Sequence, residues 1–290
     1  ISNIFGDIIE RPIQISSNSD YSLSFDGFDD YISINSDLSN FNSFTKKIVL
    51  KLNSITNQHT LFHTPNAELK IEQDKLIMVL FLDRNGGETS GHGQPSTNKI
   101  FEFNHEFLTN EWITIHLVVE DNDNVKAYIN GQQIEITSMS LDTGGMSNCN
   151  HSTIGAIQFN NWSYNTDDYF FDVSTFLNGC ISSCLLWNKP LSHNEILDET
   201  TIDQNNLVLH YDFNGIQDDI ALDNSDNENN GTIIGATWIE NIFGCTDELA
   251  INYNEQADFD DGSCQYPDNG DFSLSFDGVD DYIDIGRPSS

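Results

Sequence analysis

The chain has few basic residues and no long hydrophobic run. Its 290 residues include 11 Lys and Arg against 46 Asp and Glu, for a formal net charge of −35. Such a surface repels nucleic acid and anionic lipid, so neither is expected as a partner. No stretch reaches the roughly 20 apolar residues of a membrane-spanning helix, so no membrane insertion is expected.

The sequence motifs of several common enzyme classes are also missing. There is no Gly-x-Ser-x-Gly, no His-Glu-x-x-His and no phosphate-binding loop. There is also no Glu-x-Asp-x-Glu run of the kind that supplies the acid and the nucleophile in jelly-roll glycosidases. The sequence therefore predicts a protein that is not an enzyme.

The most informative feature that is present is a repeat. The segment YSLSFDGFDDYISI begins at Tyr21 and FSLSFDGVDDYIDI begins at Phe272, which is 272 − 21 = 251 residues later. A period of this kind indicates a slice of a longer tandem protein. Residues 1–13 are then the linker from a preceding repeat, and residues 270–290 are the first strands of the next one.

Short runs of alternating polar and apolar residues, such as residues 47–52, 75–82 and 112–119, predict strands. Gly, Asn and Asp turn residues separate them, which is typical of an all-β sandwich or jelly roll. One helix signal is convincing, a capping box in which Ser192 precedes Glu195 by three residues. The Asp- and Asn-rich residues 218–230 predict a flexible or cation-coordinating loop.

Four segments in order resemble the laminin G-like, or pentraxin-like, group of concanavalin A-type jelly rolls. They match its opening strand and turn, central hairpin, closing strand with short helix, and a strand pair, at residues 22–34, 111–134, 176–196 and 207–238. The resemblance implies a two-sheet jelly-roll sandwich over residues 14–240. Residues 207–240 either fold back onto this domain or begin the next one, and folding back is favoured because the cysteine-bounded segment that follows would otherwise interrupt the next domain.

That cysteine-bounded segment, GCTDELAINYNEQADFDDGSC, runs from Gly244 to Cys264. So small a loop cannot bury a core, so it needs a disulfide between Cys245 and Cys264, and this favours an oxidising compartment. The segment resembles a calcium-associated module of large tandem-repeat surface proteins of Bacteroidetes-type bacteria. We call residues 241–269 the C-terminal module. The resemblance implies calcium ligands, namely Asp247, Asn252, Asp260 and Asp261, and solvated carboxylates are the alternative.

The resemblance implies a second calcium site in the turn that contains Asp26, Asp29 and Asp30. The family often supplies another Asp in its closing strand, where this chain has Ser182 and Ser183. An Asp-Gly turn without a metal is the alternative interpretation.

The other three cysteines are assigned through the same resemblance. Cys184 matches an apolar position of the closing strand, so it is expected to be a buried thiol. Cys180 is then left to pair with Cys149, which precedes a neighbouring strand. Zinc is disfavoured because the Cys180–Cys184 spacing lacks a second cysteine pair.

Candidate ligand contacts come from two loops. His92 lies in one, and Trp162, Tyr164 and Asp167 lie in the other. Exposed aromatic rings beside carboxylates suit stacking on sugars and hydrogen bonds to hydroxyl groups. The alternative is that both loops are only connections.

These features together predict a calcium-stabilised repeat domain of a large extracellular adhesin or cell-surface filament. Its partners would be neighbouring repeats or copies of the same protein, with surface glycans as a further candidate. The alternative function is a carbohydrate-binding module of a secreted polysaccharide-degrading enzyme. More repeats outside the chain would favour the first, and a catalytic domain would favour the second.

Overall fold

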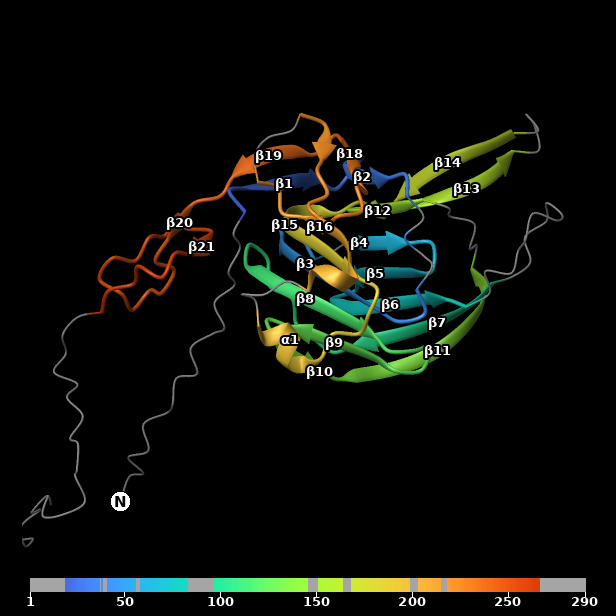
Figure 1. Ribbon diagram of the computed structural model, residues 1–290, viewed down its shortest axis with the longest axis horizontal. Coiled ribbons are helices and arrows are strands. Elements are labelled where there is room, and N and C mark those ends of the chain that lie inside the picture. Colours follow the sequence, from blue (N-terminus) through green and yellow to red (C-terminus); the bar gives the residue numbers. More distant parts are fainter. Residues whose placement is uncertain are drawn as a thin grey trace, which may run out of the picture.

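The computed structural model describes residues 19–36, 38, 41–55, 58–82, 96–145, 151–163, 168–198, 203–214 and 218–266. Over these residues the chain is nearly all β, with two large antiparallel sheets packed into a sandwich (Figure 1). The prediction of an all-β, two-sheet jelly-roll sandwich is confirmed. No helix among the described residues has the length and apolar character needed to cross a membrane.

One sheet has eight strands in the order β10-β9-β8-β3-β15-β1-β19, with β16 paired to β15. We call it the eight-stranded sheet. Its strands are β10 (Gln132–Ile134), β9 (Val125–Ile129), β8 (Trp112–Val119), β3 (Phe44–Leu52), β15 (Asn178–Trp187), β1 (Tyr21–Asp26), β19 (Thr237–Glu240) and β16 (Leu207–Tyr211).

The other sheet has nine strands in the order β11-β7-β6-β5-β4-β12-β2-β18-β17. These are β11 (Ile136–Gly145), β7 (Ser96–Phe103), β6 (Lys75–Phe81), β5 (Ala67–Glu72), β4 (His59–Thr64), β12 (Ser152–Ile154), β2 (Tyr31–Ile34), β18 (Gly231–Ile234) and β17 (Ile220–Ala221). A separate hairpin, β13 (Ile157–Ser163) with β14 (Asp168–Ser174), projects from the sandwich in Figure 1.

The core lies between the two sheets and follows the alternation of the sequence. Successive side chains of a strand point to opposite faces, so every second residue can be buried. In β3 the core positions include Ile48 and Leu50, and in β6 they include Leu76 and Met78, all fully buried. Burial of such side chains from both sheets is the main stabilising term of the fold.

Residues 207–240 pair with strands of the same sandwich. Strand β16 pairs with β15, β18 pairs with β2, and β19 pairs with β1. These pairings place the segment in this jelly roll, as folding back requires. The segment thereby flanks β1 in one sheet and β2 in the other.

The predicted capping box is confirmed at helix α1 (His193–Leu197). The Ser192 side chain accepts the Glu195 N–H, and the Glu195 carboxylate accepts the Ser192 N–H. Ile196 packs with Trp187, Leu185 and other residues in a small cluster apart from the main core. The 3₁₀ turn η1 (Gln204–Asn206) precedes β16.

The described part of the C-terminal module, residues 241–266, lies beside the sandwich (Figure 1). Its regular structure is one short parallel pair, β20 (Phe243–Gly244) with β21 (Phe259–Asp260). Asn241 anchors its start, because its side chain accepts from Ser22 Oγ at 2.6 Å and donates to the Ser19 carbonyl at 2.7 Å. The module therefore begins directly at the first strand of the sandwich.

Candidate functional site

Three carboxylates meet in the turn between β1 and β2. One oxygen from each of Asp26, Asp29 and Asp30 lies within 4.8 Å of the others. The turn is held by two bonds, from Phe28 N to Asp26 Oδ1 at 2.8 Å and from Asp26 N to Asp30 Oδ2 at 2.7 Å. Gly27 permits the reversal with φ of 89°. The structure thus brings together all three residues that the sequence assigned to this site.

The three carboxylates of this turn repel one another. Asp30 is 6% exposed, and its burial raises the pKa of its carboxyl; the bond from the Asp26 N–H opposes the rise, and the charges of Asp26 and Asp29 add to it. A divalent cation would offset this repulsion. Carboxylate oxygens are ligands that calcium prefers, and it completes its six to eight ligands with carbonyls and waters. The residues present therefore fit calcium in charge and spacing.

Sequence analysis missed Asn178 at this site. Asn178 opens β15 and lies opposite Asp26 in the strand register. Its side chain packs on Gly27, where an added Cβ would be 3.0 Å from Asn178 Cβ. No local pattern in the sequence points to it, because the contact depends on the register of β15 with β1. Ser182, where the family often has Asp, is buried in β15 and its carbonyl accepts from Ser19 Oγ.

The disulfide of the C-terminal module is confirmed. Cys245 and Cys264 are bonded, with an S–S distance of 2.09 Å and a Cα–Cα distance of 4.8 Å. Asp260 Oδ1 lies 3.5 Å from Cys264 Sγ. Because both sulfurs are bonded in the disulfide, neither can act as a thiolate ligand, so Cys245, Asp260 and Cys264 do not form a metal site.

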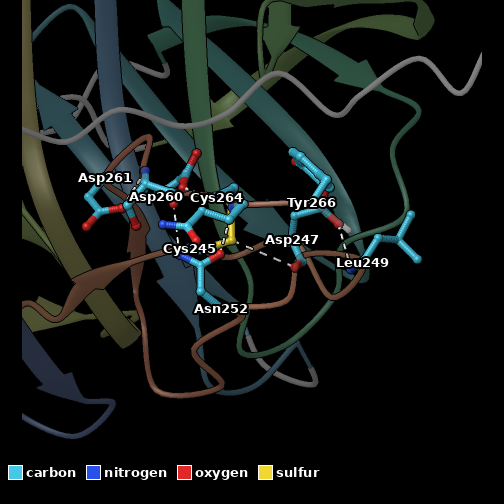
Figure 2. Close-up of a disulfide and its surroundings, with 10 residues drawn as sticks. Cys245, Asp247, Leu249, Asn252, Asp260, Asp261, Cys264 and Tyr266 are labelled. Carbon is cyan, nitrogen blue, oxygen red and sulfur yellow. Dashed lines mark hydrogen bonds between the residues drawn. A yellow bond between two sulfur atoms is a disulfide. The ribbon is translucent and has the colours of Figure 1, made fainter. Parts of the chain in front are cut away.

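The expected calcium ligands of the module are distributed around the disulfide. Figure 2 shows Asp260 and Asp261 on one side of it and Asp247 on the other, beside Tyr266. Asp247 Oδ2 accepts from the Tyr266 hydroxyl at 2.7 Å, and Asp261 Oδ1 accepts from Ser263 N at 2.9 Å. Asn252 bonds Ser263 O and Gln265 N. The structure brings Asp247 and the Asp260–Asp261 pair into one fold but not into one cluster.

The module docks on the eight-stranded sheet through Asp258. Asp258 Oδ1 accepts from Lys51 Nζ at 2.8 Å and from Trp112 Nε1 at 3.2 Å. Burial pushes the pKa of Asp258 upward, but Lys51 and the N–H groups of Ile242 and Trp112 outweigh it and hold the pKa below its usual range. The Phe259 ring lies tilted against the Trp112 indole, with the ring centroids 4.7 Å apart. The module is thus a docked element rather than a loose linker.

A second polar group, also missed, lies on the outer face of the nine-stranded sheet. Ala67, Leu69 and Ile71 of β5 belong to the core, so Glu68, Lys70 and Glu72 point outward. Thr60 Oγ1 donates to Glu68 Oε1 at 2.7 Å, and Lys70 pairs with Glu72 at 2.9 Å. Burial raises the pKa of Glu68. The Glu-x-Lys-x-Glu spacing differs at Lys70 from the Glu-x-Asp-x-Glu run of jelly-roll glycosidases.

The expected sugar contacts are mostly outside the described residues. His92, Tyr164 and Asp167 lie there. For Trp162 the structure describes the backbone, which pairs with Tyr169 across the β13–β14 hairpin. These four residues remain predictions.

The expected bridge between Cys149 and Cys180 is wrong. Cys180 is a free, buried thiol, and Cys149 lies outside the described residues. The Cys180 side chain is near Lys51 and Asp258 at the docked module, whereas β12, which follows Cys149 in the chain, belongs to the nine-stranded sheet. Cys184 is the fully buried core thiol that was expected.

Comparison with known proteins agrees with this architecture. The family model of the concanavalin A-like lectin/glucanase superfamily matches residues 25–197. No curated protein sequence matches the chain.

Three solved structures are similar. The first is a Bacteroides ovatus protein proposed to bind carbohydrate, with TM-score 0.51, 16% identity, and coverage of 77% of this chain and 60% of that one. The second is the native heptameric SAP-like pentraxin of Limulus polyphemus, with TM-score 0.41, 15% identity, and coverage of 64% and 84%. The third is the CBM40 of the Ruminococcus gnavus IT-sialidase bound to α2,3-sialyllactose, with TM-score 0.38, 15% identity, and coverage of 63% and 100%. At these identities the similarity shows the fold alone.

Proposed function

The chain belongs to the concanavalin A-like lectin/glucanase superfamily, and on that premise we propose that it is a non-catalytic, glycan-binding domain stabilised by calcium. The observation that carries the proposal is the family match over residues 25–197 on a two-sheet jelly roll. The domain acts outside the cell, where a disulfide such as Cys245–Cys264 persists.

A role in an adhesin or surface filament built of repeats is supported by the duplicated segments at residues 21–34 and 272–285. The docked C-terminal module supports the same role, since it would hold consecutive repeats at a defined angle. A carbohydrate-binding module of a secreted enzyme is the second candidate, favoured by the similar Bacteroides ovatus protein. Both share the step that can be tested on this chain, which is the recognition of a glycan.

The test of glycan binding is an array probed with the full chain, with and without calcium. We expect binding to one class of glycan that chelator weakens and that Trp162→Ala reduces about two- to twelvefold, because stacking on an aromatic ring contributes about 0.5–1.5 kcal/mol. Leu249→Ala, at a 68% exposed residue of the module, is the matched control and is expected to bind like wild type. An array without signal in calcium would contradict the proposal.

Calcium should also raise thermal stability. A ligand that binds only the folded state at 100 times its Kd adds about 2.7 kcal/mol, equivalent to roughly 5–10 °C in a domain of this size. We expect excess chelator to lower the melting temperature and calcium to restore it better than magnesium. Asp29→Asn tests the β1–β2 turn and Asp261→Asn tests the module. A melting curve that chelator leaves unchanged would argue against both sites.

A further inference from the structure

The sequence of β1, β2 and the turn between them, which we call the β1–β2 segment, occurs a second time in the chain. Residues 272–285 match residues 21–34 at eleven of fourteen positions. The three differing positions are those of Tyr21, Phe28 and Ser33. Phe28 is 78% exposed and the other two are only half-buried, so the two copies differ nowhere in the core.

Every core residue of the β1–β2 segment is retained in the second copy. Leu23, Phe25, Ile32 and Ile34 are all 0% exposed in the main core. Their counterparts at a spacing of 251 are Leu274, Phe276, Ile283 and Ile285. The acidic turn is also retained, as Asp277, Asp280 and Asp281, together with Gly278.

The β1–β2 segment occupies one position in each sheet. Strand β1 lies between β15 and β19, and β2 lies between β12 and β18. We call these two positions together the β1–β2 slot. Both strands are interior to their sheets, so an empty slot would open the two sheets at once.

Three glycines shape the walls of this slot. A Cβ on Gly155 would come within 2.8 Å of the Phe25 ring. A Cβ on Gly231 would come within 2.5 Å of Ile32, and one on Gly235 within 2.0 Å of Asp30. The second copy has the same three side-chain types at the equivalent positions, Phe276, Ile283 and Asp281. In the slot, the second copy would therefore make the same contacts as the first.

We propose that residues 272–285 are a second copy of the β1–β2 segment, interchangeable with residues 21–34, and that their partner is the β1–β2 slot of a jelly roll of this sequence. The inference deepens the repeat-array part of the proposed function, on which it rests. Its test measures folding rather than glycan binding, so the failure of one proposal is distinguishable from the failure of the other.

The experiment disables the first copy in the full chain. The variant Leu23→Asp with Phe25→Asp puts two charges into the core, which by itself would prevent folding. We expect this variant to keep a cooperative thermal unfolding transition, because the second copy occupies the slot. Adding Leu274→Asp and Phe276→Asp should abolish the transition, whereas those two substitutions alone should leave the sandwich folded.

Leu50→Asp is the matched control. Leu50 is fully buried in β3, and its segment has no second copy in the chain. This variant is expected to lose the transition whether or not residues 272–285 are intact. The proposal is overturned if the Leu23→Asp, Phe25→Asp variant has no transition, or if its transition persists after the second copy is disabled.

Discussion

Replacement of Lys46 by alanine is expected to lower the free energy of unfolding by about 3–5 kcal/mol, because it leaves a cavity and removes a donor from buried acceptors. Lys46 is fully buried on the core side of β3. Its ammonium donates to Thr64 Oγ1 at 2.9 Å, to Ala67 O at 2.9 Å and to Phe62 O at 3.2 Å. It also lies 4.7 Å from the centre of the Phe62 ring. One side chain of the eight-stranded sheet thereby holds the β4–β5 turn of the nine-stranded sheet.

Lys46→Met is the matched control for volume. Methionine keeps most of the stem and avoids the cost of a buried charge, while Ala67 O retains its bond from Thr64 Oγ1. We expect it to cost about 1–2 kcal/mol, well below the alanine variant. Chemical denaturation of both variants measures the difference. Equal losses would show that the missing ammonium, and not the cavity, dominates.

The same lysine makes stability depend on pH. Burial lowers the pKa of Lys46 to about 7 against the opposing charge of Glu68, while the unfolded chain keeps the ordinary value of 10.5. Between these values the unfolded state binds the extra proton, so the free energy of unfolding rises with pH. From pH 7 to 8.5 the wild type should gain up to about 2 kcal/mol relative to Lys46→Met. Cys184 faces Lys46 but has a raised pKa and stays protonated in this window. If the free energy of unfolding changed with pH in the same way in the wild type and in Lys46→Met, the lowered pKa of Lys46 would be contradicted.

The part of the fold that could be predicted is the part encoded by local pattern. Alternation predicts strands such as β8 and β3 because burial on one face needs only a period of two. The capping box predicts α1 because both of its hydrogen bonds join residues three apart in sequence. The acidic turn is similarly local, since Asp26, Asp29 and Asp30 converge within five residues.

The rest depends on contacts between distant residues. Lys46 lies on the same face of its strand as the core residues Ile48 and Leu50. The groups that accept its hydrogen bonds are 16 to 21 residues away, however, and no sequence pattern shows them. Cys180 was expected to pair with Cys149 because it was the cysteine left over. That expectation is wrong, because its side chain is beside Lys51, at the docked module. Asn178 reaches the acidic turn only through the register of β15 with β1.

The loop at residues 218–230 shows why composition alone misleads. It was predicted to be flexible or to coordinate a cation, yet its buried Asp223 is satisfied by the chain itself. The carboxylate accepts the N–H groups of His210 and Asn229 at 2.8 Å each and that of Ser225 at 3.0 Å. Backbone N–H groups here stabilise the carboxylate as a cation would, and the Asp and Asn content does not distinguish a loop of this kind from a cation-binding one.

Loss of the Cys245–Cys264 disulfide is expected to open the C-terminal module while the sandwich stays folded. The module buries few large side chains, Phe259 at 2% exposure being the chief one, so it has little core of its own. Closing a loop with a sequence separation of 19 contributes about 3 kcal/mol in the chain-entropy model. Removing it should raise the open population of the module by more than about a hundredfold.

The variant with both Cys245→Ser and Cys264→Ser tests this by hydrogen exchange. Amides that bond within the module, such as Asn254 N to Cys245 O at 2.9 Å, should lose protection, and those between β3 and β8 should keep it. Trp112 fluorescence should shift to the red as Phe259 and Asp258 leave the indole. Cys180→Ser is the control, because that free thiol takes no part in the loop. If protection in the module survives, docking through Asp258 and Phe259 is sufficient to hold it, and the disulfide is not what keeps the module folded.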